Sequence, residues 1–381
     1  NTVTMSSTTQ TTGAATGITC TASGTGAQIT VRSNTVSGCT FTGTTSGAFN
    51  GITQTHSSAS TVNDVSKNTV SSNNRPGTGQ FMGIMSFSGN APTLSTLSMD
   101  SNTVSLNTKG STGSMFCIYN GVTVSASLTM TQNGNTVNGN VITGGTLACT
   151  LVGITAQATN FTMNGNTVTN NSVTAVTGTG AGNVLAIQSS GAGTATSAIT
   201  NNTVTGVTLG GVSSGASLVR GILATSATTD NRTISGNVIS GVSTSNATSA
   251  TCIGIITAIG GNTNIFKNKI YGFFPGQNST VFSGAKGIII AGGTSNNVYN
   301  NHIGFDYSSP VLPLLVSNNC VVGLEVSGGT AANLHYNTVR LAGAGSGVNF
   351  GSSGINLTVT TTNVTLKNNL VLNLLSAGSS A

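Results

Sequence analysis

Few residues in this 381-residue sequence have side chains suited to acid–base, metal or nucleophilic chemistry. It contains five carboxylates, three histidines and six cysteines. The carboxylates are Asp64, Asp100, Asp230, Asp306 and Glu325. Cleavage of a polysaccharide needs a pair of acids, or acids that hold calcium beside a base, at one site. Any such chemistry therefore depends on which of these five acids the fold brings together.

Two groups of ionisable residues could meet. Asp64 and Asp100 occupy similar positions in adjacent copies of the repeat described below, but no third acid joins them. The second group consists of Asp306, Glu325, His302 and His335. Asp306 and Glu325 fall at distant positions of one repeat, which predicts different faces. We interpret these acids as isolated solvated or loop-capping charges. We therefore assign no catalytic, cofactor-binding or metal-binding residue, and we expect neither a cofactor nor an enzyme.

The cysteines lack the Cys-x-x-Cys spacing of metal sites. Cys117 and Cys149 follow their repeat anchors by 15 and 14 residues in adjacent repeats. Stacking of the repeats would place their Cα atoms about 5 Å apart, which is within disulfide range. The spacing predicts either a disulfide between Cys117 and Cys149 or two buried thiols.

The composition excludes several classes of protein. Only 4% of residues are charged, against about 25% in ordinary domains. The eleven basic residues are scattered, so the net charge of +6 does not predict a nucleic-acid partner. No apolar run approaches the ~20 residues of a membrane span. Abundant Gly, Thr, Ser and Asn with 37% hydrophobic residues favour an all-β protein with a core.

A short phrase, Asn followed two residues later by Val or Ile, recurs every 31 to 36 residues. Its anchors are Asn1, Asn34, Asn68, Asn102, Asn135, Asn166, Asn202, Asn237, Asn268, Asn301, Asn337 and Asn369. The residue three before the anchor is apolar except at Gln132, where Asn133 read as the anchor would restore the pattern. A small residue followed by an aliphatic one, such as Gly51-Ile52, marks the middle of most repeats.

Short strands that repeat at a fixed period must stack on their neighbours to bury a core. We therefore predict one continuous all-β domain over residues 1–381, a parallel β-solenoid (β-helix) of about eleven coils of about 33 residues. Right-handed connections are the default for parallel strands. Eleven coils would make a rod about 50 Å long.

The sequence resembles right-handed parallel β-helices with pectin-lyase-like repeats. It is most similar to the repetitive β-helical surface and filament proteins of Bacteroidota-type bacteria, which contain phrases like NNTVTGV at 201–207 and SGNVISGV at 235–242. This resemblance covers essentially the whole chain and implies the fold. It implies no particular function, because the same fold hosts lyases, hydrolases, adhesins and fibre proteins. The family's catalytic motifs have no counterpart in this sequence.

The repeated residues are expected to build the fold. Asn tolerates the left-handed turn conformation, and stacked Asn amides can bond to one another as a ladder. The residue after the anchor should point outward. In the first seven coils it is threonine, namely Thr2, Thr35, Thr69, Thr103, Thr136, Thr167 and Thr203. Such a file is typical of ice-binding solenoids, but threonine is also simply a good residue for an exposed strand.

Residues 262–381 differ in character from the rest of the chain. They hold ten of the seventeen aromatic residues together with Pro275, Pro310 and Pro313. These aromatic residues either fill a thicker core or form a contact surface for a neighbour. We expect a more aromatic terminal section of the same solenoid.

The chain begins on an anchor and stops before its last coil is complete, which predicts uncapped solenoid ends. Uncapped ends favour head-to-tail self-association into a filament. The sequence thus favours an extracellular, cell-surface structural protein, the subunit of a filament, fibre or adhesive stalk, with glycans or surfaces as further partners. The alternatives are a polysaccharide-binding or polysaccharide-cleaving β-helix and an ice-binding protein.

Overall fold

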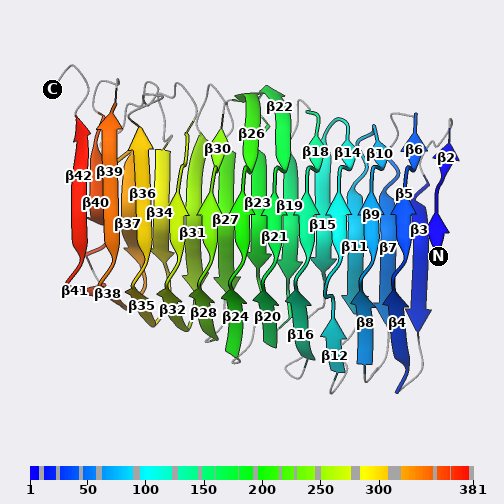
Figure 1. Ribbon diagram of the computed structural model, residues 1–381, viewed down its shortest axis with the longest axis horizontal. Coiled ribbons are helices and arrows are strands. Elements are labelled where there is room, and N and C mark those ends of the chain that lie inside the picture. Colours follow the sequence, from blue (N-terminus) through cyan, green and yellow to red (C-terminus); the bar gives the residue numbers. More distant parts are fainter. Residues whose placement is uncertain are drawn as a thin grey trace.

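The computed structural model of the chain is a stack of parallel β-strands wound into a solenoid. The strands form four sheets, and each strand pairs with its counterparts in neighbouring coils. Figure 1 shows the strands side by side across the long axis, from blue at the N-terminal end to red at the C-terminal end. The prediction of an all-β, right-handed parallel β-solenoid with coils of about 33 residues is confirmed.

The structure describes residues 1–7, 13–22, 26–42, 46–56, 62–88, 95–121, 128–144, 148–158, 160–178, 180–191, 196–213, 217–226, 230–244, 250–275, 284–307, 319–345, 350–360 and 362–376. No helix occurs in these ranges. The same ranges accordingly contain no helical segment of the length and apolarity that crossing a membrane requires.

Sheet A contains the strands that follow each anchor asparagine, and sheet B contains the short strands after them. The strands of sheet A are β1 (Thr2–Val3), β5 (Thr35–Ser37), β9 (Thr69–Ser71), β13 (Thr103–Ser105), β17 (Thr136–Asn138), β21 (Thr167–Thr169), β25 (Thr203–Thr205), β29 (Val238–Ser240), β33 (Lys269–Tyr271), β36 (His302–Tyr307), β39 (Thr338–Ala344) and β42 (Leu370–Ser376). The strands of sheet B are β2 (Ser6–Ser7), β6 (Thr40–Phe41), β10 (Asn74–Arg75), β14 (Thr108–Lys109), β18 (Val141–Ile142), β22 (Ser172–Gly178), β26 (Thr208–Ser213) and β30 (Ser243–Thr244).

Sheets C and D complete the coil. The strands of sheet C are β3 (Ala15–Ala22), β7 (Phe49–His56), β11 (Phe81–Ser88), β15 (Gly113–Asn120), β19 (Cys149–Ala156), β23 (Gly182–Ser189), β27 (Ser217–Ser226), β31 (Ala250–Ile259), β34 (Gly284–Ala291), β37 (Val321–Gly328) and β40 (Ser352–Leu357). The strands of sheet D are β4 (Gln28–Arg32), β8 (Val62–Ser66), β12 (Ser95–Ser98), β16 (Leu128–Asn133), β20 (Asn160–Asn164), β24 (Thr196–Thr200), β28 (Asn231–Ser235), β32 (Asn262–Phe266), β35 (Ser295–Tyr299), β38 (Ala331–His335) and β41 (Asn363–Lys367).

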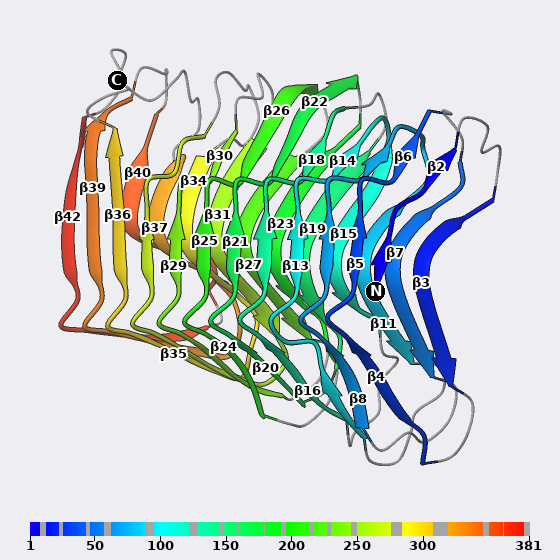
Figure 2. The same ribbon diagram turned by 45° about the vertical axis from the view of Figure 1, so that its right-hand side comes forward.

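Left-handed corners turn the chain from sheet D into sheet A and from sheet A into sheet B. Lys67 precedes the anchor Asn68 with φ 58°, and Ser72 takes φ 54° at the next corner. Figure 2 shows the first of these corners as a sharp bend between the two sheets. From the sequence we expect the anchor asparagine to adopt the left-handed turn conformation. In the structure the residue before the anchor adopts it instead.

Inward files of aliphatic side chains fill the solenoid. The Val or Ile two residues after each anchor is fully buried from Val36 to Val339. The Gly-Ile landmark is explained by close packing between sheets C and A. A Cβ on Gly51 would lie 2.5 Å from the carbonyl oxygen of Gly83 in the next coil and 2.8 Å from the side chain of Val70. The position therefore favours a small residue, and the other coils carry glycine, Ala186 or Cys117 there.

The section from residue 262 onward differs in its strands as well as in its composition. Within the described ranges, sheet B has no strand after β30. The strands of sheet A lengthen from three residues in β33 to six in β36 and seven in β39 and β42. Phe273, Phe305 and Tyr307 are buried there, and their rings contact one another. Pro310 and Pro313 lie outside the described residues.

Candidate functional site

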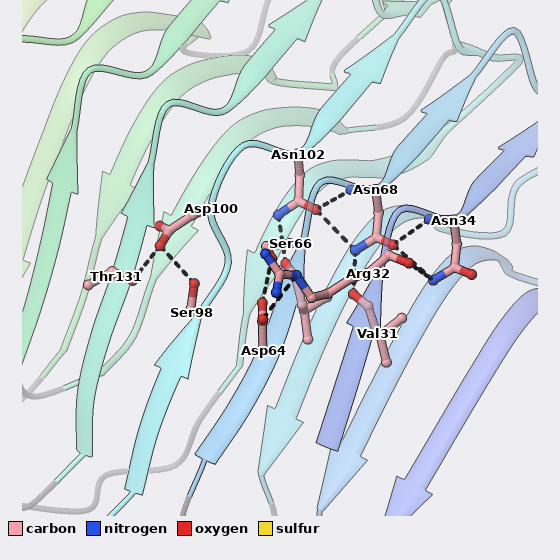
Figure 3. A network of polar contacts seen from close by, with 11 residues as sticks. Val31, Arg32, Asn34, Asp64, Ser66, Asn68, Ser98, Asp100, Asn102 and Thr131 are labelled. Atoms are coloured by element: carbon pink, nitrogen blue, oxygen red, sulfur yellow. Dashed lines mark hydrogen bonds and ion pairs between the residues drawn. The ribbon is translucent and has the colours of Figure 1, made fainter. Parts of the chain in front are cut away.

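The twelve anchor asparagines form one ladder inside the corner between sheets D and A. Asn34 donates to the Oδ1 of Asn68 through its backbone N–H at 3.0 Å and through its Nδ2 at 3.1 Å. The Nδ2 of Asn68 also donates to the carbonyl oxygen of Val31 at 2.7 Å (Figure 3). Every step from Asn1 to Asn369 contains a bond of this kind. These amides are engaged within the protein, so their role is structural.

A second asparagine ladder, which the sequence analysis missed, lies five residues further along four coils. It consists of Asn73, Asn107, Asn140 and Asn171. Each amide bonds to the next as in the first ladder, and all four are buried. Cys39 occupies the position before the ladder and Val207 the position after it. The recurrence of asparagine five residues after four consecutive anchors was the available signal.

Two buried cations lie beside this second ladder, and their burial was not predicted from the sequence. Arg75 and Lys109 are paired in register on β10 and β14 and are fully buried. The Nζ of Lys109 donates to the carbonyl oxygens of Gly77 and Gly110, each at 3.1 Å, and to that of Thr112. Burial lowers the pKa of Lys109 to about 8. No carboxylate pairs with Lys109 among the described residues, and backbone carbonyl groups accept the hydrogen bonds of its ammonium.

The two acids of adjacent coils each have partners of their own. The Oδ2 of Asp64 lies 3.2 Å from the Nε of Arg32. Asp100 accepts hydrogen bonds from the Oγ of Ser98 at 2.7 Å and from the Oγ1 of Thr131 at 2.9 Å (Figure 3). Asp64 is in register with Ser98, two residues before Asp100, so the carboxylates belong to different files of sheet D. Each carboxylate is engaged by partners of its own.

The remaining acids each pair with a basic residue. Asp306 lies 2.9 Å from Arg340 at sheet A, and Glu325 lies 2.7 Å from Lys286 on sheet C. Asp230 pairs with the buried Arg232, and burial raises the pKa of Asp230. Across the described ranges, no three His, Cys, Asp or Glu side chains come together as metal ligands would. The acids therefore act as partners for cations.

Cys117 and Cys149 are both buried and both free. Cys149 pairs in register with Gly113, four residues before Cys117 on β15. The predicted disulfide is therefore wrong, and the alternative of two buried thiols describes the structure. Counting residues from the anchors gave the wrong register for these cysteines. Lys109 pairs with Ile142 and Gly113 pairs with Cys149, so the second coil has three more residues between these two points than the first. Burial raises the pKa of both thiols.

The outward threonines of sheet A lie in register. Thr2 pairs with Thr35, and the pairing continues coil by coil to Thr203. A second outward file follows two residues later and runs from Ser37 to Thr205. Strand spacing sets the hydroxyls about 4.8 Å apart along each file. The arrangement is a regular array of hydroxyls and amides that presents no titratable group.

Comparison with protein-family models, with curated proteins and with solved structures finds no match to the chain. The part of the resemblance that the structure supports is the parallel β-solenoid itself.

Proposed function

We propose that the chain is an extracellular structural protein, a rigid β-solenoid section of a surface filament or adhesive stalk, without enzymatic activity. The unbroken asparagine ladder is the observation that carries this proposal. Each coil bonds to the next through sheets A, C and D and through a buried amide. Separating two coils along the rod therefore requires breaking all of these bonds together.

The outer surface is suited to association with like surfaces. Only sixteen residues in the sequence are charged, so side-by-side rods repel one another little. The likeness of the repeat phrases to surface proteins of Bacteroidota-type bacteria supports a bacterial cell-surface location.

Head-to-tail stacking is part of the same proposal. Leu366 and Val371 belong to inward files, yet they are 51% and 41% exposed because no described coil covers them. A further coil, from a second copy or from a longer chain, would bury these side chains and pair with the free edge of β42.

Electron microscopy with sedimentation tests the filament. We expect rods that grow end to end with an axial repeat of about 50 Å per copy. Val371→Asp should stop this growth, because it places a charge between stacked coils. Val62→Asp is the matched control, since Val62 is equally exposed on the side of the rod. Short, monodisperse monomers of the unmodified protein under native conditions would overturn the proposal.

Ice binding is a second candidate, favoured by the registered threonine file. Thermal hysteresis of the purified protein tests it. Thr103→Lys should abolish the hysteresis, because it interrupts the centre of the file. Thr233→Lys on sheet D is the control, since neither of its neighbours in register, Ala198 and Asn264, is a threonine. Absence of hysteresis in the unmodified protein would exclude this function.

A further inference from the structure

The outer face of sheet A changes its chemistry between β29 and β33. Up to β25 its outward residues are threonine, serine and asparagine. On β33 they are Lys269 and Tyr271, and both are exposed. The corner beside these strands exposes Lys267 and Tyr336, where earlier coils carry residues such as Ser33 and Gly134.

A row of leucines continues this face on β42. Leu370, Leu372 and Leu374 are 65%, 45% and 56% exposed. They are in register with Thr338, Arg340 and Ala342 of β39. This register places them on the outward files, unlike Leu366 and Val371, whose exposure belongs to the end of the solenoid. Their position on the side of the rod does not depend on what covers that end.

We call the lysines, the tyrosines and this leucine row the basic–apolar patch. Sheet register carries the file of Lys269 through His302 and Thr338 to Leu370. Lys269 and Leu370 are thus three coils apart, or about 14 Å along the rod. Figure 2 shows β36, β39 and β42 as neighbouring parts of one face, and β33 pairs with β36.

The patch is electropositive. Lys267 and Lys269 form no ion pair with any described residue. Asp306 is the acid on this face, and it pairs with Arg340 at 2.9 Å. Lys367 is exposed at the end of β41, on the other side of the corner. An anionic partner would therefore meet unpaired ammonium groups and no free carboxylate.

We propose that the basic–apolar patch binds the surface of an anionic lipid bilayer. Lysines beside an anionic membrane are attracted to its phosphates, and tyrosine rings favour the interface between water and hydrocarbon. The leucines would enter the hydrocarbon boundary, as the apolar side of a peripheral membrane surface does. The contact is peripheral and is made by the part of sheet A from β33 to β42.

The leucine row separates this ligand from other polyanions. A nucleic acid or an acidic polysaccharide would contact the lysines and tyrosines but would leave three outward leucines in water. Tight binding to a nucleic-acid backbone also typically uses about 6–10 phosphate contacts, which is more than this patch has cations to make. Cations, aromatic rings and leucines on one face together fit a lipid surface.

Flotation with lipid vesicles tests the electrostatic part. The full chain should float with vesicles of phosphatidylcholine mixed with phosphatidylglycerol much more than with phosphatidylcholine alone. The variant Lys267→Asn/Lys269→Thr installs residues that the same positions carry at Asn201 and Thr203. It should partition about 30-fold more weakly, since each lysine contributes about fivefold near an anionic surface. Lys67→Asn is the matched control at the same corner of an earlier coil and should partition like the unmodified chain.

A second variant tests the contribution of the leucine row to membrane binding. Leu370→Thr/Leu372→Ser restores the residue types of the earlier coils and should remove the binding that remains at high salt. Leu106→Thr, at an exposed leucine of an earlier coil, should not. Failure of the unmodified chain to float, equal loss in the Lys67 control, or binding to heparin or DNA in place of vesicles would overturn the proposal. None of these outcomes bears on filament growth, which microscopy measures separately.

Discussion

The coils up to β30 and the coils from β32 onward share one backbone plan but differ inside and out. In the earlier coils the interior contains the second asparagine ladder and two cations, and the outside of sheet A is lined with hydroxyls. In the later coils the second-ladder position is taken by the buried ring of Phe273, and sheet A carries lysine, tyrosine and leucine outside.

The first asparagine ladder is common to both regions. It runs from Asn1 to Asn369, although the residues at the second-ladder position and on the outer face of sheet A differ between the two regions. The ladder and the aliphatic files are therefore sufficient to define the coil, and the other positions are free to vary. This explains how one solenoid can present a hydroxyl face and a basic–apolar face on the same sheet.

Interrupting the common ladder should produce the largest effect. In Asn102→Ala, the backbone N–H and Nδ2 of Asn68 lose their acceptor, and the carbonyl of Val65 loses its donor. Each buried polar group left without a partner costs about 1–3 kcal/mol. We expect the free energy of unfolding to fall by roughly 4 kcal/mol in chemical denaturation. Asn138→Ala, on the outer face of β17, should change it by no more than about 0.5 kcal/mol. Similar losses for the two variants would refute the structural role of the ladder.

Titration of Lys109 should give the next largest effect and belongs to the earlier coils alone. Its pKa is about 8 in the folded protein, against an ordinary value of 10.5, because burial disfavours the ammonium. At this residue the unfolded chain holds more protons between these values, so the contribution of Lys109 to stability should rise with pH from about 8 to 10.5. The expected gain is roughly 3 kcal/mol. The buried thiols, whose pKa is raised, contribute in the opposite direction over this range.

Denaturation at a series of pH values measures this gain. The free energy of unfolding of the unmodified chain relative to that of Lys109→Met should rise by this amount across the range, whereas Lys67→Met, at an exposed corner, should follow the unmodified chain at every pH. A difference between the unmodified chain and Lys109→Met that stays constant with pH would show that Lys109 does not titrate in this range.

Asn102 and Lys109 also show which parts of the structure could be predicted from the sequence. The period of about 33 residues predicted the coil, the register of the sheets and the first ladder, because one residue type marked every coil. The second ladder has only four members, and simple strand alternation predicts that their side chains face outward. Val104 is inward two residues after its anchor, and Asn107 and Lys109 are inward at the fifth and seventh. The left-handed Leu106, between Val104 and Asn107, reverses the strand alternation, so counting by twos from Val104 would place Lys109 outside.

The end of the second ladder allows two valine-to-asparagine substitutions to be compared within one coil. Asn171 accepts from the backbone N–H of Asn140 at 3.0 Å and from its Nδ2 at 2.9 Å, and Val207 occupies the next position. Val207→Asn would supply the same acceptor to Asn171, so we expect a cost within about 1 kcal/mol. Val204→Asn, in the buried aliphatic file of sheet A, should cost roughly 3 kcal/mol.

The pair is measured by chemical denaturation under identical conditions. Equal costs for Val204→Asn and Val207→Asn would mean that the second ladder cannot be extended by its local hydrogen-bonding rule.

The smallest expected effect compares one corner from each region. Leu106 and Tyr336 both take φ 55° and are both exposed. A left-handed residue other than Gly, Asn or Asp costs roughly 1 kcal/mol, and Asn201 and Asn300 occupy such corners elsewhere in the chain. Leu106→Asn should therefore raise the free energy of unfolding by roughly 1 kcal/mol. Tyr336→Asn should gain less, because the ring of Tyr336 packs edge-on against His335, with centroids 6.5 Å apart. Equal gains in thermal unfolding would show that this ring contact adds nothing to the fold, and Tyr336 would then serve the outer face alone.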